Sequence, residues 1–304
     1  MTTRVTNDMV MGSTLADINN AQVQMERTER ELSSGKSILE PSDNPQGASQ
    51  AIELESALGG LGDYETSAND GKAWLGAANG ALNGINEATQ RVRELVVQAG
   101  NGTNSQANLN SIASEVEQLT QVVKQDANTQ YAGQYIFSGT ATGTAPYQQG
   151  EVDTYSGNSG SISRAIGPST NVAVTVPISS LLGEGKAAND GKLLDTLRTI
   201  VVNLREGTPA AREALNSKDL GALETNMSTL DSLQAGVGAN TAQITAATAR
   251  IEDLRDTTTT QLSSIQDANF AQVSLEYSNQ QAAYTAALRA GASIVQESLL
   301  EFLH

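Results

Sequence analysis

The triplet Gly35-Lys36-Ser37 is the residue group that comes nearest to a phosphate-binding loop. Such a loop has the pattern G-x-x-x-x-G-K-[ST], in which backbone amides surround the phosphates and the lysine reaches their oxygens. The first glycine is missing here, because Arg30 occupies its position, and a proline-containing turn follows where a helix would be needed. We therefore predict that the triplet ends a helix and binds no nucleotide.

The other candidate catalytic and metal-binding groups are carboxylates without suitable partners. Glu252 and Asp253 are neighbours in a helical stretch, so their side chains point apart toward solvent. Asp153 and Asp190 lack the spacing of a calcium-binding loop. The chain has no cysteine and one histidine, His304, which disfavours thiolate sites, histidine-rich metal sites and histidine-dependent triads. The sequence predicts a protein that is not an enzyme and that uses no cofactor or metal.

The charge of the chain limits the classes of partner that it can bind. The formal net charge is -16, and the 18 lysine and arginine residues do not cluster. Binding to nucleic acids or anionic lipids requires clustered basic residues. No run of 18 apolar residues exists, as a membrane-spanning helix would need, and residues 1–13 lack the pattern of a cleavable signal peptide. We expect no nucleic-acid binding, no membrane insertion, and a cytosolic location unless another export route is used.

The last third of the chain, residues 237–303, carries the longest regular pattern. Apolar residues recur three and four positions apart, and no proline follows Pro209. A continuous helix of this length would be about 100 Å long. Such a helix cannot bury its apolar side alone, and the aromatic content of 4% suits thin helix–helix contacts better than a thick core. We expect a weak point at 257–261, where four threonines lower helix propensity.

A helix over residues 5–34 is the predicted partner of the C-terminal helix. Its apolar residues are separated by 4, 3, 7 and 7 positions: Met11, Leu15, Ile18, Met25 and Leu32. Gln22 and Glu29 fall on the same track, so the helix needs a partner to be stable. Gly35 is a natural end for it, and a rigid turn over 38–47 follows.

Between the two ends we predict a helical middle and a β-rich insertion. Helical patterns occupy 48–58, a stretch from about 65 to 100, and 106–130, and helices resume near residues 193, 209 and 220. The second and third helices would form an antiparallel hairpin. Residues 134–182 are rich in glycine, serine and threonine and hold three of the six prolines. Short strand-like runs lie there at 134–137, 152–155 and 172–176.

The predicted fold class is mainly α, an elongated bundle of long helices with paired N- and C-terminal coiled-coil helices and a small β-rich insertion. We expect residues 1–40 plus 265–304 to form a terminal coiled-coil assembly domain that is disordered in the monomer. Residues 41–133 plus 191–264 would form a helical core domain, and residues 134–190 the insertion domain.

Three stretches resemble the bacterial flagellin family: LSSGKSILEPSDNPQGAS at 32–49, QRVRELVVQAGNGTNS at 90–105, and the C-terminal helix at 265–303. Within the family, PSDNP at 41–45, GQYIFSG at 133–139 and the ending LLEFLH favour the hook-associated proteins of the hook–filament junction. The stretch at 90–105 is equally like filament flagellin, which stays the alternative. A cytosolic scaffold coiled coil is a further, less fitting interpretation.

The resemblance implies a structural protein of the flagellum. Such a protein is exported by the flagellar type III apparatus with a cytosolic chaperone on its C-terminal helix. It lies outside the cell, between hook-associated protein 1 and flagellin, and self-associates in a ring or helical layer. In the family, an innate immune receptor of animal hosts can recognise the helix that carries Arg91 and Leu95.

The candidate assembly interface consists of the apolar residues of the two terminal helices: Met11, Leu15, Ile18, Met25, Leu32, Tyr277, Tyr284, Leu288, Val295, Leu299 and Phe302. The aromatic members have two interpretations. They fill the contact between the two helices, as any apolar residue would, or they anchor contacts between subunits, where aromatic residues contribute disproportionately.

Overall fold

The computed structural model describes residues 7–102, 104–148, 150, 153–185 and 188–302, with side chains 7, 8, 10 and 294–302 excepted. The chain forms two compact units. The first comprises the described residues up to Gly60 together with those from Leu254 on, and the second comprises Leu61–Asp253. None of the helices in the described ranges is long and apolar enough to cross a membrane.

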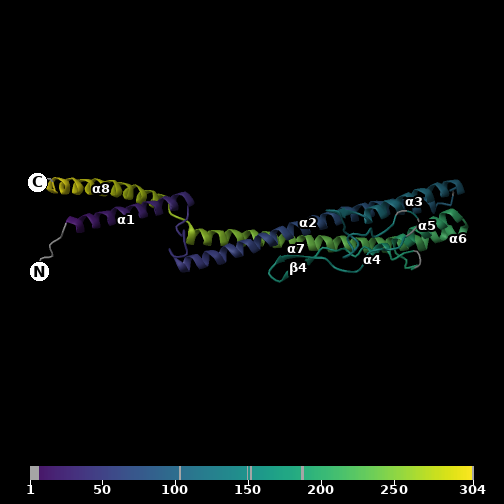
Figure 1. Ribbon diagram of the computed structural model, residues 1–304. Helices are drawn as coiled ribbons and strands as arrows, with labels where there is room; N and C mark the ends of the chain where they lie inside the picture. Colours follow the sequence, from purple (N-terminus) through teal and green to yellow (C-terminus); the bar gives the residue numbers. More distant parts are fainter. Residues whose placement is uncertain (1–6, 103, 149, 151–152, 186–187, 303–304) are drawn as a thin grey trace. The chain divides into compact units, whose positions relative to one another are not determined.

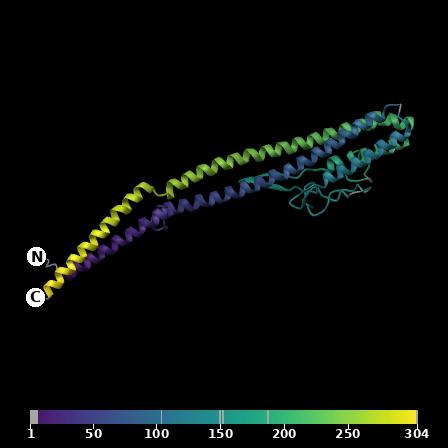
Figure 2. The same cartoon turned by 90° about the horizontal axis from the view of Figure 1, so that it is seen from above.

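Two helices dominate the first unit. Helix α1 (Asn7–Ser34) packs along helix α8 (Phe270–Phe302), as Figures 1 and 2 show. Helix α1 ends where predicted, because Gly35 takes a left-handed conformation with φ of +69° that favours glycine. The next helix, α2 (Pro45–Ala99), begins with proline in its first turn, and the Asn44 side chain accepts a hydrogen bond from the Gly47 amide at 3.0 Å.

The predicted division of α2 into a weak helix over 48–58 and a second helix from about 65 is wrong. The structure has one helix through Gly59, Gly60 and Gly62. Glycine costs about 1 kcal/mol relative to alanine in a helix interior. Buried residues on both sides of the glycines, such as Ala51 and Ala68, provide the packing that holds the helix together.

The expected break of the C-terminal helix at 257–261 is also wrong. Helix α7 (Leu220–Gln266) runs through the threonines, and the chain leaves the helix only at Asp267 before α8 begins at Phe270. The hydroxyls of Thr258 and Thr260 donate to the carbonyl oxygens of Leu254 and Asp256, four residues earlier. These bonds satisfy the hydroxyls within the helix, so the threonines do not interrupt it.

The core of the second unit lies between α2, helix α3 (Gln106–Ala127) and the residues of α7 that belong to this unit. Buried residues recur at helical spacing along α2 from Leu75 to Ala99, including Thr89, whose hydroxyl donates to the Ile85 carbonyl at 2.7 Å. Trp74 is 1% exposed and packs edge-on against Tyr131, with ring centroids 6.0 Å apart. Arg91 of α2 pairs with Glu115 of the following helix α3 at 2.8 Å, so the predicted αα-hairpin is present.

The β region is smaller than predicted and consists of two antiparallel hairpins. Strands β1 (Gln130–Tyr131) and β2 (Gln134–Tyr135) form one, and β3 (Ser163–Gly167) and β4 (Thr170–Ala173) form the other. Strand β3 was not predicted. The run at 152–155 contributes only a single bridge from Tyr155 to Tyr147, and its residue 152 lies outside the described part of the chain. The run at 172–176 is a strand only up to Ala173, but the side chains of Val174 and Val176 are buried in the core like that of Val172.

The second hairpin is fastened to helices of its own unit. The Arg164 guanidinium on β3 lies 2.6 Å from the Asp70 carboxylate of α2 and 5.8 Å from the centre of the Trp74 ring. The Asn240 amide of α7 donates to the Ala173 carbonyl at 3.0 Å. The hairpin is thus held by polar contacts at both of its strands.

Short helices complete the second unit: α4 (Ser179–Leu182), α5 (Leu193–Glu206), α6 (Pro209–Ala214) and the π-helical turn η1 (Leu215–Asp219). Helix α5 packs against α3. Thr208 caps α6 by accepting from the Ala211 amide at 3.2 Å, with proline in the first turn as predicted. The prediction of a mainly α protein of long helices, paired terminal helices and a small strand region is confirmed.

Candidate assembly interface

The α1–α8 contact has a regular spacing of buried and half-buried residues. On α1 these residues alternate four and three positions apart: Thr14, Ile18, Ala21, Met25, Thr28 and Leu32. On α8 the same spacing holds: Val273, Tyr277, Gln280, Tyr284, Ala287 and Gly291. This spacing places one continuous side of each helix against the other, as in a coiled coil.

The predicted interface residues divide into three groups. Five lie within the helix contact: Ile18, Met25, Leu32, Tyr277 and Tyr284. Met11, Leu15 and Leu288 lie beside it with 42%, 55% and 43% of their surface exposed. Val295, Leu299 and Phe302 belong to α8, but their side chains lie outside the described residues.

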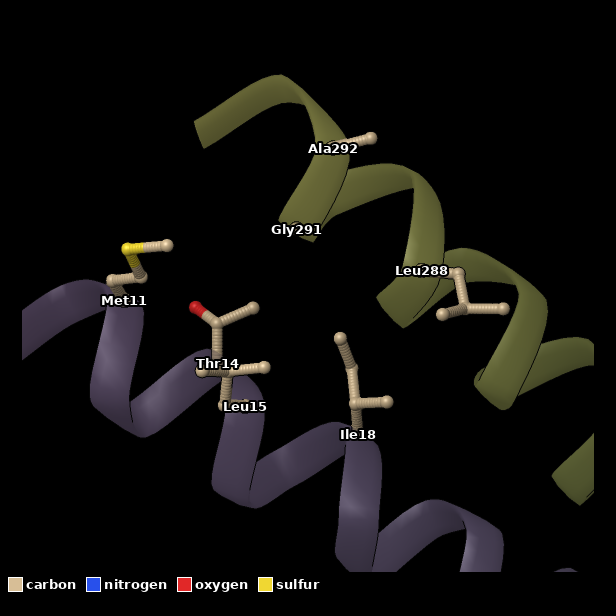
Figure 3. A pocket seen from close by; sticks show the side chains of 7 residues that line it. All are labelled: Met11, Thr14, Leu15, Ile18, Leu288, Gly291 and Ala292. Atoms are coloured by element: carbon tan, nitrogen blue, oxygen red, sulfur yellow. The ribbon is translucent and has the colours of Figure 1, made fainter. Parts of the chain in front are cut away.

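Beside the contact, an apolar groove of about 360 Å³ opens between the two helices (Figure 3). Its lining residues come from both helices: Met11, Thr14, Leu15, Ile18, Leu288, Gly291 and Ala292. A side chain at Gly291 would place its Cβ 3.2 Å from the Ile18 Cδ1 atom and 3.4 Å from the Thr14 Cγ2 atom. The missing side chain therefore lets α8 approach α1 closely at this point.

The sequence pattern missed several contact residues: Thr14, Ala21, Thr28, Gln280, Ala287 and Gly291. It placed Gln22 and Glu29 on the contact side, but both are exposed, and Ala21 and Thr28 take their places. Small and polar residues give no hydrophobic signal, so an apolar track alone cannot find them. The exact seven-residue spacing of Thr14, Ala21 and Thr28 is the signal that could have revealed them.

Large apolar side chains are also exposed elsewhere in the first unit. Val23, Leu275 and Phe270 expose 58%, 63% and 69% of their surface, and Ile52 exposes 63%. Single exposed apolar residues are ordinary, but several on one pair of helices are typical of a surface that binds other proteins.

The chain segments between the helices of the first unit are joined by backbone hydrogen bonds. The Ser37 amide donates to the Gln266 carbonyl at 2.7 Å, and the Ala268 amide donates to the Gly35 carbonyl at 2.9 Å. Asp43 fixes the turn, since its carboxylate accepts from the backbone amides of Leu39 and Glu40. These two bonds, with a smaller contribution from nearby Arg27, lower the pKa of Asp43 below its usual range.

A buried ion pair links the insertion to the helices of the second unit. The Lys124 ammonium of α3 lies 2.5 Å from the Asp153 carboxylate, and these side chains are 1% and 8% exposed. The same carboxylate pairs with Arg198 of α5, which also pairs with Asp195 at 2.9 Å. These charges compensate one another, so the group is a structural anchor.

Two carboxyl groups of the second unit lie in surroundings that disfavour their charged form. Burial raises the pKa of Asp126, with a further contribution from nearby Glu87. Burial also raises the pKa of Asp219, although the Asn203 amide donates to it at 2.6 Å. Because both pKa values lie above the ordinary value near 3.8, these groups favour the folded state at low pH, and this contribution is lost as the pH rises through the raised values.

Two sequence models of one family match the two ends of the chain. The bacterial flagellin N-terminal helical region matches residues 5–142, and the bacterial flagellin C-terminal helical region matches residues 220–303. The chain belongs to the bacterial flagellin family.

Among flagellin-family relatives, the flagellar hook-associated protein 3 of Escherichia coli K12 is 25% identical over 304 residues, which cover 94% of this chain and 95% of the relative. The phase 1 flagellin of Salmonella naestved is 38% identical over 123 residues, which cover 40% of this chain and 24% of that flagellin. The similarity to hook-associated protein 3 thus extends over nearly the whole of both chains.

Solved structures show the same fold. A putative flagellar hook-associated protein from Vibrio parahaemolyticus superposes with a TM-score of 0.66 at 15% identity, over 74% of this chain and all of that chain. FlgL of Xanthomonas campestris superposes with a TM-score of 0.59 at 20% identity, over 69% of this chain and 99% of that chain. The predicted resemblance to the flagellin family, and within it to hook-associated protein 3, is confirmed.

Proposed function

We propose that the chain is a structural subunit of the bacterial flagellum that connects the hook to the flagellin filament. One observation carries this proposal: the similarity to hook-associated protein 3 spans 94% of the chain and 95% of that relative. The similarity to filament flagellin covers only 24% of the flagellin. A protein whose whole length matches one type of relative shares that type's architecture, whereas a local match shows only a common helical end.

In this role the chain contacts hook-associated protein 1 on one side and flagellin on the other, and self-associates in a ring or helical layer. It leaves the cell through the flagellar type III apparatus, with a cytosolic chaperone bound before export. Its final location is extracellular, at the hook–filament junction. No partner is a nucleic acid or a membrane, in keeping with the net charge of -16 and the scattered basic residues.

The first unit supplies the assembly surface in this proposal. Its exposed apolar residues Met11, Leu15 and Leu288 border the groove between α1 and α8. A pair of helices that leaves such residues exposed gains apolar burial when neighbouring subunits cover them. The terminal helices are disordered in the monomer and order on assembly, which supplies the burial that their ordering requires.

The domain assignment predicted from the sequence extends this proposal. Residues 1–40 plus 265–304 serve assembly, 41–133 plus 191–264 form the helical core, and 134–190 form the insertion. The two compact units of the structure divide the chain differently, with boundaries near residues 60 and 254.

Filament flagellin is the second candidate, favoured by the higher local identity of 38%. Deletion of the gene followed by electron microscopy distinguishes the two functions. If the chain is the junction subunit, we expect hooks without filaments and monomeric flagellin in the medium. If the chain is the filament subunit, flagellin itself disappears from both the cells and the medium, and the junction proposal fails.

A further inference from the structure

The α1–α8 contact contains one polar pair, formed by a buried threonine and a half-buried glutamine. Thr28 of α1 is 4% exposed, and it is the only polar side chain that is fully buried among the described residues of the first unit. Its hydroxyl lies 2.6 Å from the amide oxygen of Gln280 on α8 and donates to it. The other hydroxyl contacts of Thr28 are to carbonyl oxygens of its own helix, so the bond to Gln280 is specific to the partner helix.

Apart from Gly291, the remaining contact residues do not distinguish one alignment of the helices from another. Residues facing each other repeat every seven positions on both helices, and most are apolar or small. A slip of one repeat, about 10 Å along the axis, would again place apolar residues opposite one another. The contact therefore needs a separate feature that selects one alignment.

Only the observed alignment satisfies Thr28 and Gln280 together. The two helices run antiparallel, so a slip of seven residues places Ala287 or Val273 opposite Thr28. In either case the bond between the two side chains is lost: the Thr28 hydroxyl keeps only the carbonyl oxygens of its own helix, and the half-buried Gln280 amide oxygen loses its donor. A buried polar group without a partner is unfavourable, which is why single polar residues fix the register of coiled coils.

Gly291 opposes a slip in one of the two directions. Its position lies against Ile18 and Thr14, where an added Cβ would already be 3.2 Å from the Ile18 side chain. A slip of one repeat in one direction brings Tyr284 to this place, where its Cβ would press on the Ile18 and Thr14 side chains. A slip in the other direction separates Gln280 from Thr28 and moves it toward the helix end at Gly35.

We propose that Thr28 and Gln280 form a register lock, which fixes the alignment of α1 with α8 and so determines which apolar residues border the groove. They are positioning residues of the assembly interface. The proposal deepens the proposed assembly role, but it rests on the pairing of the two helices and not on the place of the protein in the flagellum.

Engineered cysteine pairs can report the alignment of α1 with α8, because the chain has no cysteine of its own. The pair Thr14→Cys with Gly291→Cys reports the observed alignment, and Ala21→Cys with Gly291→Cys reports a slip of one repeat. Disulfide formation is followed in the purified full chain at low concentration, in ammonium sulfate, which strengthens apolar burial. Circular dichroism first establishes that the terminal helices are formed under these conditions.

We expect the first pair to form at least about ten times faster than the second, which is a difference of about 1.4 kcal/mol in the alignment equilibrium. In a Thr28→Val, Gln280→Leu background, the two rates should come within about threefold of each other. The matched control Gln243→Leu, Thr245→Val changes the same residue types at exposed positions of α7 and should leave the preference intact.

A preference that survives the loss of Thr28 and Gln280 would overturn the proposal, and so would equal rates in the parent chain. Neither result depends on where the protein is found in the cell. Absence of the protein from purified flagella would instead contradict the proposed function and leave the register measurement valid.

Discussion

Replacing Tyr284 with aspartate should remove the protein from the flagellum while the second unit stays folded. Tyr284 lies half-buried in the α1–α8 contact, so the substitution places a carboxylate among apolar residues of both helices. Burying a polar group without a partner costs about 1–3 kcal/mol. This cost recurs in every subunit of an assembled layer, so we expect incorporation to fall by about tenfold or more.

The measurement is the amount of the variant in flagella purified from a deletion strain that expresses it, together with swimming. Asn279→Asp is the matched control, because it adds the same charge to an exposed position of the same helix and should leave incorporation unchanged. Thermal unfolding followed by the fluorescence of Trp74, the only tryptophan of the chain, reports the second unit. Loss of that transition in Tyr284→Asp would show that the terminal helices do not fold separately from the rest.

Replacing Asp153 with asparagine should strongly destabilise the second unit. The substitution leaves the Lys124 ammonium, which is 1% exposed, without its carboxylate, and Arg198 loses one of its two acidic partners. Removing one member of a buried ion pair costs about 3–5 kcal/mol, because the remaining charge stays away from water. Urea unfolding followed by Trp74 fluorescence measures this loss.

An exposed ion pair of the same unit supplies the control for Asp153→Asn. Glu117 lies 2.7 Å from Arg205, and their side chains are 44% and 59% exposed. Glu117→Gln should therefore change the free energy of unfolding by no more than about 1 kcal/mol. Adding Lys124→Met to Asp153→Asn should recover part of the loss, since it removes the buried ammonium that Asp153 no longer compensates. Equal effects of Asp153→Asn and Glu117→Gln would show that the buried group does not anchor the insertion.

The apolar pattern was enough to place the helices of the second unit and their buried residues. From Leu75 to Ala99 the buried side chains of α2 are mostly apolar and regularly spaced, so their burial follows directly from the sequence. The pattern failed where the low helix propensity of single residues predicts a break but the packing of the whole helix prevents one. Three glycines and four threonines suggested breaks in α2 and α7, but packing on either side and hydrogen bonds within the helix hold both helices together.

The candidate interface was predictable only in part, for a related reason. Ile18, Met25 and Tyr284 are apolar and were found from their spacing. Thr28 and Gln280 are polar, and their partnership across 252 positions of sequence appears only when the two helices are placed side by side. The anchor Asp153 was missed for the same reason, because a carboxylate is recognised as part of an ion pair only once its partners Lys124 and Arg198 are next to it.

Hydrogen exchange tests most directly whether the paired terminal helices order when the protein assembles. Amide exchange over Val273–Ser293 is compared between the soluble chain and purified flagella, with Trp74–Ala99 of α2 as an internal reference. We expect rapid exchange of Val273–Ser293 in the soluble chain, protection increased by about a hundredfold or more in flagella, and strong protection of α2 in both. Full protection of Val273–Ser293 in the soluble chain would contradict this ordering on assembly.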